Sequence, residues 1–118
     1  MDKVKVSDKR LLSVEKPARY TGGELNSIVK ETARLRFALC FPDVYEIGMS
    51  HLGSRILYEV INSREEYACE RCFAPWPDME KAMRENNVPM FTLETRTPLA
   101  ECDIVGFSLL YEMCYTNI

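Results

Sequence analysis

The feature that most constrains this chain is a continuous apolar run, LRFALCF at residues 35–41, which ends at Pro42. A short apolar run without polar alternation is typical of a strand that is buried on both faces, as in a parallel sheet. Apolar residues then recur at helical spacing, so we expect a helix that buries this face. They are Met49, Leu52, Ile56, Leu57, Val60 and Ile61. A buried strand followed by an amphipathic helix indicates an α/β fold.

The alternation of strand and helix continues along the chain. Residues 67–74 predict a second strand, and residues 75–86 predict a second helix that starts at Pro77 and stops at Asn86-Asn87. Its inner face is expected to hold Met79, Ala82 and Met83. The apolar stretches 88–94 and 102–110 predict two more strands, and Pro89 indicates that the first is an edge strand or that the proline stands at the start of the strand. The sequence therefore predicts a mostly parallel sheet with helices packed on it.

Two boundaries follow from this pattern. Residues 1–34 contain Pro17 and the pair Gly22-Gly23, and we interpret them as an irregular N-terminal extension of a domain at 35–118. The last ten residues, LLYEMCYTNI, approach helical spacing and stop at Ile118. We therefore expect a partial, truncated α/β domain, whose unfinished edge would be covered by homo-oligomerisation or left disordered.

Composition excludes several classes of protein. The 118 residues carry a net charge of −3, which argues against direct nucleic-acid binding. No apolar run approaches the roughly 20 residues of a membrane span, and the polar N-terminus is unlike a signal peptide. We therefore predict a cytoplasmic protein without membrane contact, whose 5 cysteines are reduced. Three of them, Cys40, Cys102 and Cys114, lie among apolar residues, which is typical of small core residues.

The turn FPDVYEIGMSHLG at residues 41–53 is the first candidate site. Ligands of open α/β sheets bind beyond the carboxyl ends of the strands, where this turn would lie. Gly48 and Gly53 would let a backbone or ligand come close, and Asp43 and Glu46 would accept hydrogen bonds. The two carboxylates disfavour a phosphate, and the spacing matches neither a dinucleotide fingerprint nor a P-loop. The alternative interpretation is turn glycines, a helix cap at Ser50 and exposed acids.

Two further polar residues belong to the same end of the predicted sheet. His51 falls off the apolar stripe and can donate a hydrogen bond, carry a proton or ligate a metal, although no second ligand stands at metal spacing. Its alternative is an ordinary surface or cap histidine. Ser108 lies at the end of the fourth apolar stretch and would face a bound cofactor or cap the next segment of the chain.

Cys69 and Cys72 form a CxxC pair, which can bind zinc or act as a redox couple. A structural zinc site needs a second pair, and this pair lies in a predicted strand, where the two sulfurs would point to opposite faces. A structural role is therefore favoured. Trp76 and the neighbouring prolines are interpreted as packing residues.

Four separated blocks carry a resemblance to a known family. They are KPARYTGGELNS, FPDVYEIGMSHLG, FAPWPDME and DIVGFSLLYEMCYTN, and they extend from about Pro17 to Asn117. In this order they resemble the start of a group of radical S-adenosylmethionine proteins, often labelled Fe-S oxidoreductases, that have an N-terminal cobalamin-binding-like domain. The resemblance implies a flavodoxin-like, three-layer α/β sandwich, and a downstream radical domain of the same protein as its partner.

The resemblance also implies cofactors. A CxxxCxxC motif that holds a [4Fe-4S] cluster and cleaves S-adenosylmethionine belongs to the parent protein, since these 118 residues lack it. The segment itself would be non-catalytic and would hold cobalamin at its strand-end turns. The cofactor-binding residues assigned to this site are Asp43, Tyr45, Glu46, Gly48, His51, Gly53 and Ser108. The turn does not contain the DxHxxG signature of histidine-ligated cobalamin proteins.

Two other functions stay open at this point. One is a cofactor-free interaction domain that positions a substrate or the catalytic domain. The other is a flavodoxin-like redox domain that uses Cys69 and Cys72.

Overall fold

The computed structural model describes residues 14–23, 27–109 and 112–118. The regular elements, in chain order, are the 3-10 helix η1 (Pro17–Tyr20), strand β1 (Leu35–Phe41), helices α2 (Tyr45–Ser50) and α3 (Leu52–Asn62), strand β2 (Tyr67–Phe73), helix α4 (Pro77–Glu85), the 3-10 helix η2 (Leu99–Glu101), strand β3 (Ile104–Phe107) and the 3-10 helix η3 (Glu112–Asn117). None of the helices within the described ranges has the length and apolar character that a membrane span requires.

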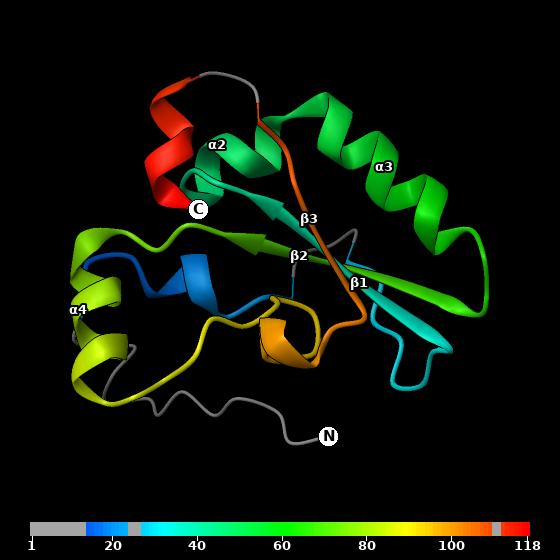
Figure 1. Cartoon of the computed structure of the whole chain (residues 1–118), viewed down its shortest axis with the longest axis horizontal. Helices are drawn as coiled ribbons and strands as arrows, with labels where there is room; N and C mark the ends of the chain where they lie inside the picture. Colours follow the sequence, from blue (N-terminus) through cyan, green and yellow to red (C-terminus); the bar gives the residue numbers. More distant parts are fainter. Residues whose placement is uncertain (1–13, 24–26, 110–111) are drawn as a thin grey trace.

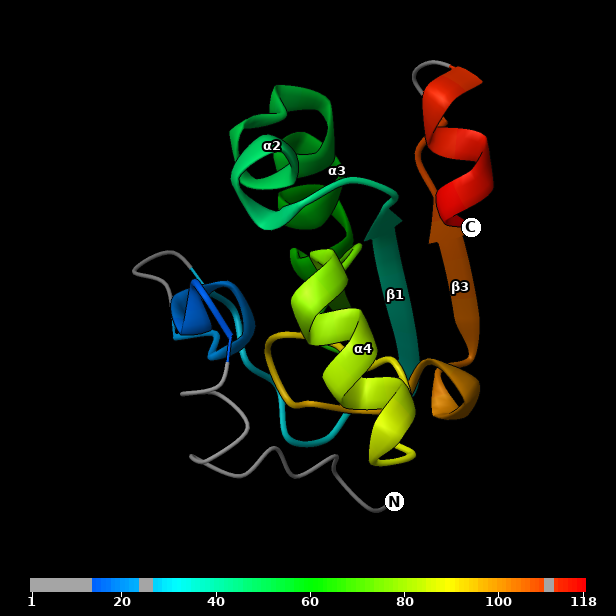
Figure 2. The same ribbon diagram turned by 90° about the vertical axis from the view of Figure 1, so that its left-hand side faces the viewer.

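The three strands form one open sheet in the order β2-β1-β3, and both pairs are parallel. The α/β class with a parallel sheet is therefore as the sequence predicts, and it is consistent with a flavodoxin-like fold. The order equals the first three positions of the flavodoxin order 2-1-3-4-5, in which the strand order reverses between β1 and β3. Figure 2 shows β1 and β3 pointing to the same end of the molecule, where α2 and η3 lie.

Helix α3 covers one face of the sheet, where Tyr58 packs with Leu39 and Cys69 (Figure 1). The prediction that its apolar stripe is buried is wrong for most of the stripe, although Ile61 packs against this cluster. The stripe residues Leu52, Ile56, Leu57 and Val60 are between 48% and 67% exposed. The buried residues of α3 are Ser54, Tyr58 and Asn62, which follow one another at intervals of four.

The polar face of α3 is buried because each of its groups has a partner. The Tyr58 hydroxyl accepts a hydrogen bond from the Ile28 amide at 2.7 Å and donates one to Glu94 at 3.1 Å. The Asn62 side chain donates to the Cys69 carbonyl at 3.0 Å and accepts from the Cys69 amide at 2.9 Å. Burial of polar groups that have hydrogen-bond partners costs little free energy. The pattern of polar and apolar residues alone therefore did not reveal the inner face of α3.

The opposite face of the sheet is covered by the chain between α4 and β3. Ala38, Cys40 and Cys72 form a buried cluster there, against which Leu99 and Cys102 pack. Glu70 lies on the same face, is fully buried and pairs with Arg36. Its carboxylate also accepts hydrogen bonds from the hydroxyls of Thr92 and Thr95, at 2.6 and 2.5 Å.

The strand predicted at residues 88–94 is absent from the sheet. In that stretch the structure has a single antiparallel bridge, between Phe91 and Pro98. The chain turns there because its polar groups form hydrogen bonds with the outer edge of β2 instead. The Leu93 amide donates to the Arg71 carbonyl at 2.9 Å, and the Glu94 carboxylate accepts from the Arg71 amide at 2.8 Å. With Asn62, these two groups close the outer edge of β2.

Helix α4 begins at Pro77 and stops before Asn86 and Asn87, as the sequence predicts. Asn87 has a φ of 53°, the left-handed conformation that often ends a helix. The buried residues of α4 form a cluster with residues of the N-terminal extension. This cluster contains Val14, Tyr20, Met79, Met83 and Phe91. The described part of the extension therefore packs on the domain.

Strand β3 lies at the other edge of the sheet and remains exposed. Ile104, Val105 and Phe107 have exposed fractions of 43%, 38% and 43%. Gly106 faces the ring of Phe37, which lies where a β-carbon would be. This close approach explains the glycine that the sequence singled out, although the neighbour is a side chain and not a backbone. The side chain of Cys114, expected in the core, lies outside the described residues.

Candidate functional site

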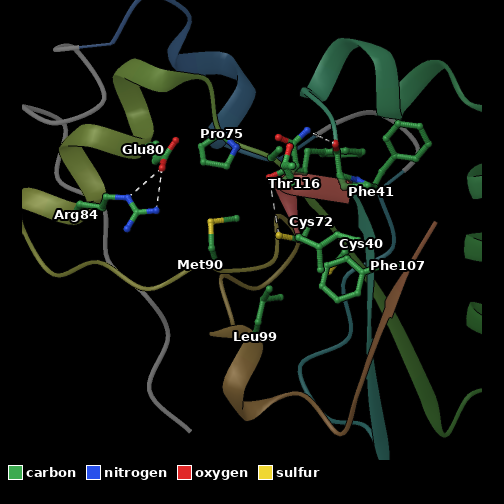
Figure 3. Close-up of a pocket in the computed structure, with 15 residues that line it drawn as sticks. Cys40, Phe41, Cys72, Pro75, Glu80, Arg84, Met90, Leu99, Phe107 and Thr116 are labelled. Atoms are coloured by element: carbon green, nitrogen blue, oxygen red, sulfur yellow. Dashed lines mark hydrogen bonds and ion pairs between the residues drawn. The ribbon is translucent and has the colours of Figure 1, made fainter. Parts of the chain in front are cut away.

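A cavity of about 380 Å³ opens at the carboxyl ends of the strands (Figure 3). It lies on the face of the sheet opposite α3, and we call it the strand-end cavity. Its lining residues are Cys40, Phe41, Pro42, Cys72, Phe73, Ala74, Pro75, Glu80, Arg84, Met90, Leu99, Phe107, Thr116, Asn117 and Ile118. This is the place where open α/β sheets bind ligands.

The strand-end cavity has an apolar floor and a charged rim. In Figure 3, Cys40, Cys72 and Phe107 lie on one side of it and the pair Glu80 and Arg84 on the other. The guanidinium of Arg84 is 2.9 Å from the Glu80 carboxylate, one turn away on α4. The rim pair is exposed, so it leaves the entrance open to water and small polar molecules.

The C-terminal helix η3 borders the same cavity. The side-chain amide of Asn117 donates a hydrogen bond to the Pro42 carbonyl at 2.8 Å. This contact joins residues 75 positions apart, and it places η3 against the end of β1. The cavity is therefore built from the ends of β1 and β2, from α4 and from η3.

Two predicted site residues, Asp43 and Ser108, directly follow residues that line this cavity. The Asp43 carboxylate accepts a hydrogen bond from the Val44 amide at 2.7 Å, and its carbonyl accepts one from the Ala74 amide at 2.9 Å. The Ser108 amide donates to the Cys40 carbonyl at 3.0 Å. Both residues thus stabilise the ends of strands at the point where the strand order reverses.

Tyr45 and Glu46 start helix α2 and face other partners. The Tyr45 ring meets the Phe73 ring edge to face, with centroids 5.7 Å apart. The Glu46 carboxylate accepts a hydrogen bond from the Arg19 guanidinium at 2.8 Å. That hydrogen bond lowers the pKa of Glu46, so the carboxylate is ionised and engaged with the N-terminal extension.

Gly48 is required by a close packing contact. A β-carbon at this position would lie within 3.0 Å of the Phe73 ring, a separation that real β-carbons do not show. Gly53 lies in the first turn of α3, where a β-carbon would come 2.9 Å from the His51 ring. In this structure both glycines make room for rings of the protein itself.

His51 ends α2 and caps α3. Its Nδ1 accepts a hydrogen bond from the Ser54 amide at 3.1 Å and lies 2.9 Å from the Ser54 hydroxyl. A neutral imidazole carries one proton, so acceptance at Nδ1 places that proton on Nε2. The ring also packs on Phe41, with centroids 5.1 Å apart. His51 therefore has the role of a cap histidine in this structure.

The seven predicted residues do not converge on one cavity. Among the described residues that line the strand-end cavity, none belongs to the predicted set, although Pro42 and Phe107 are their immediate neighbours. The assignment of the seven residues to a cofactor stays a prediction. No group of three or more metal-ligating side chains occurs in the part of the chain that the structure describes.

The cavity instead contains a pair of thiols that sequence reasoning missed. Cys40 and Cys72 are register partners on β1 and β2, and both are 4% exposed. The two thiols interact with each other, which lowers the pKa of Cys40 and raises that of Cys72. A signal for this pair was present, since each cysteine is the last residue but one of its strand.

The CxxC motif is divided by the sheet, as predicted. Cys69 faces α3 in the cluster of Leu39 and Tyr58, whereas Cys72 faces the strand-end cavity. Burial raises the pKa of Cys69 to about 12, so this thiol stays protonated at neutral pH. The two cysteines therefore do not form a redox couple with each other in this fold.

A comparison with known protein families gives one match. Residues 53–118, more than half of the chain, match a family described as radical SAM proteins, N-terminal. Comparisons with curated proteins and with solved structures gave no match.

Proposed function

This chain belongs to the family of radical SAM N-terminal domains, and from that premise we propose that it is a non-catalytic domain that docks against the radical domain of its parent protein. The observation that carries the proposal is the open β3 edge of the sheet. Parallel sheets normally have both faces covered, and their strands are then buried. In β3, Ile104, Val105 and Phe107 are instead 38% to 43% exposed.

A second apolar surface supports the same proposal. The outward stripe of α3, with Leu52, Ile56 and Val60, is 53% to 67% exposed. Exposed helical stripes of this kind are typical of surfaces that pack against a partner. We assign the radical domain as the occupant, because the family is defined as the N-terminal part of radical SAM proteins. The [4Fe-4S] cluster and S-adenosylmethionine would then be held by the parent outside this chain.

Hydrogen exchange tests the docking proposal. The amides of α3 and β3 are compared between the isolated chain and the parent protein. Docking should slow the exchange of β3 amides by about tenfold or more, because a docked edge no longer opens freely. Amides of α4, where Lys81 and Glu85 face solvent, serve as the internal control. Equal exchange of β3 in both proteins would contradict the proposal.

A corrinoid-binding domain is the second candidate. It is favoured by the strand order, because the reversal between β1 and β3 lies next to the strand-end cavity. The geometry of His51 does not fit a cobalt ligand, since Nδ1 caps α3 and Nε2 carries the proton. A corrinoid would therefore be held here without a histidine ligand, by the strand-end turns.

Titration with hydroxocobalamin separates the two candidates. Corrinoid binding predicts a change in the absorbance of the cobalamin and its retention with the protein on gel filtration. His51→Ala should leave that spectrum unchanged, because no histidine–cobalt bond forms. If neither the chain nor the parent protein retains the corrinoid, the second candidate fails and the docking proposal still stands.

A further inference from the structure

We propose that Cys40 and Cys72 are a peroxide-oxidisable dithiol that closes to a disulfide across the two central strands. The proposal rests on placement. Cys40 and Cys72 are direct partners in the parallel register of β1 and β2, and their side chains share one buried cluster with Ala38. Adjacent strands lie about 4.8 Å apart, which is within the range of Cα separations that a disulfide spans.

Access is the second requirement, and the strand-end cavity supplies it. Both cysteines are 4% exposed, yet both line the cavity of about 380 Å³. A molecule the size of hydrogen peroxide fits within that volume. The open rim formed by Glu80 and Arg84 lets a small polar oxidant enter from solvent.

The opposite pKa shifts of the two neighbouring thiols divide their roles. The interaction between the two sulfurs lowers the pKa of Cys40 and raises that of Cys72. The sulfur with the larger thiolate fraction reacts first with a peroxide. Cys40 is therefore the attacking sulfur and Cys72 the resolving one.

The chemistry balances in two steps. The Cys40 thiol loses its proton, the thiolate attacks one oxygen of hydrogen peroxide, and the O–O bond breaks; the leaving hydroxide takes up the released proton, so the products are Cys40 sulfenic acid and water. The Cys72 thiol then attacks the sulfenic sulfur, the S–O bond breaks, and a second water leaves as the S–S bond forms. Two thiols are oxidised by two electrons, and one peroxide is reduced to two waters.

Two other cysteines of the chain provide matched controls. Cys69 is on the opposite face of β2, fully buried, and its pKa is raised to about 12. Cys102 packs against the same cluster as the pair, and burial raises its pKa. Neither should compete with Cys40 for a limiting amount of peroxide.

The test is oxidation of the whole chain with limiting hydrogen peroxide. Remaining thiols are blocked with iodoacetamide, the chain is digested, and the peptides are analysed by mass spectrometry. The expected product is a peptide pair linked through Cys40 and Cys72, with two hydrogens fewer than the reduced peptides. It should form at least about tenfold faster than any product at Cys69.

Variants assign the roles within the pair. In Cys72→Ser the sulfenic acid should persist on Cys40 and be trapped by dimedone, whereas Cys40→Ser should give no dimedone adduct at position 72. Cys69→Ser and Cys102→Ser should leave the rate unchanged. Near-UV circular dichroism verifies that each variant is folded. The proposal is overturned if wild-type oxidation is spread over all thiols, or if the first disulfide involves Cys69 or Cys102.

Discussion

The two edges of this sheet differ in how far the rest of the chain covers them. At the β2 edge, the backbone of Cys69 is hydrogen-bonded to the Asn62 side chain. The backbone of Arg71 is hydrogen-bonded to the Leu93 amide and the Glu94 carboxylate. At the β3 edge the strand presents partly exposed apolar side chains. Edge strands left unpaired are templates for association, and proteins usually block them. The difference teaches that one edge of this sheet has backbone groups hydrogen-bonded by other parts of the chain, whereas the other edge keeps apolar side chains exposed.

The largest loss of stability at the β2 edge is expected for Glu94→Ala. The Glu94 side chain is fully buried and pairs with Arg71 at 2.7 Å. Removal of one member of a buried ion pair leaves the other charge unpaired, so we expect a loss of about 3–5 kcal/mol in the free energy of unfolding. Urea denaturation followed by circular dichroism measures it.

The control for this change is Glu80→Ala. It breaks an exposed pair on α4 and should cost less than about 0.5 kcal/mol. A loss for Glu94→Ala as small as that of the control would show that the β2 edge does not depend on its ion pair.

Asn62→Ala should have the next largest effect. It removes two hydrogen bonds to the backbone of Cys69 and leaves a buried amide and carbonyl without partners. Buried groups left unsatisfied cost about 1–3 kcal/mol, and we expect a destabilisation in that range. Asn86→Ala, whose exposed side chain donates one hydrogen bond to the Ala82 carbonyl, is the comparison by denaturant unfolding. Equal losses for the two variants would argue against a sealed β2 edge.

The pH dependence of stability gives a third measure. Burial raises the pKa of Glu94 above its ordinary value of 4.5, and Arg71 opposes that shift only in part. Between 4.5 and the raised value, the folded state holds a proton that the unfolded state has lost. The free energy of unfolding should therefore fall as the pH rises through this window, by at most about 1.4 kcal/mol per pH unit.

Glu94→Gln isolates this contribution, because it removes the titrating group and keeps the shape of the side chain. The difference in stability between the wild type and Glu94→Gln should change with pH in this window and be constant above it. Parallel curves for the two proteins from pH 4 to pH 8 would show that Glu94 titrates normally.

The smallest effect on stability is expected at the open edge. Val105→Lys places a charge on a side chain that is already 38% exposed, and it should change the free energy of unfolding by about 0.5 kcal/mol or less. The same change should weaken the docking of the radical domain, because a lysine at the contact would be desolvated. Sedimentation of the variant with and without the radical domain measures this. A large loss of stability would mean that β3 belongs to the core.

Sequence reasoning found the elements of the sheet more reliably than their contacts. The runs at 35–41 and 67–73 were recognisable because continuous apolar strands have few alternatives. The inner face of α3 was assigned wrongly, because Ser54, Tyr58 and Asn62 are buried by hydrogen bonds that come from distant residues. Residues 88–94 have the composition of a strand. They form none in the sheet, because the Glu94 carboxylate accepts a hydrogen bond from the Arg71 amide at the edge of β2.

The candidate site was less predictable, for a physical reason. The turn at 41–53 was correctly placed at the end of β1, but which of its groups are free depends on Arg19, Phe73 and Ser54. None of these partners is evident from spacing along the chain. The thiol pair of Cys40 and Cys72 depends on strand register, which only the paired strands define.

The contact between Gly48 and the Phe73 ring has a consequence for the family as a whole. Because the ring occupies the volume of the absent side chain, neither position is free to vary alone. Among relatives, an aromatic residue at position 73 should be accompanied by glycine at position 48, and a larger residue at 48 by a smaller one at 73. Such paired variation would mark relatives that share this junction between the first helix and the second strand.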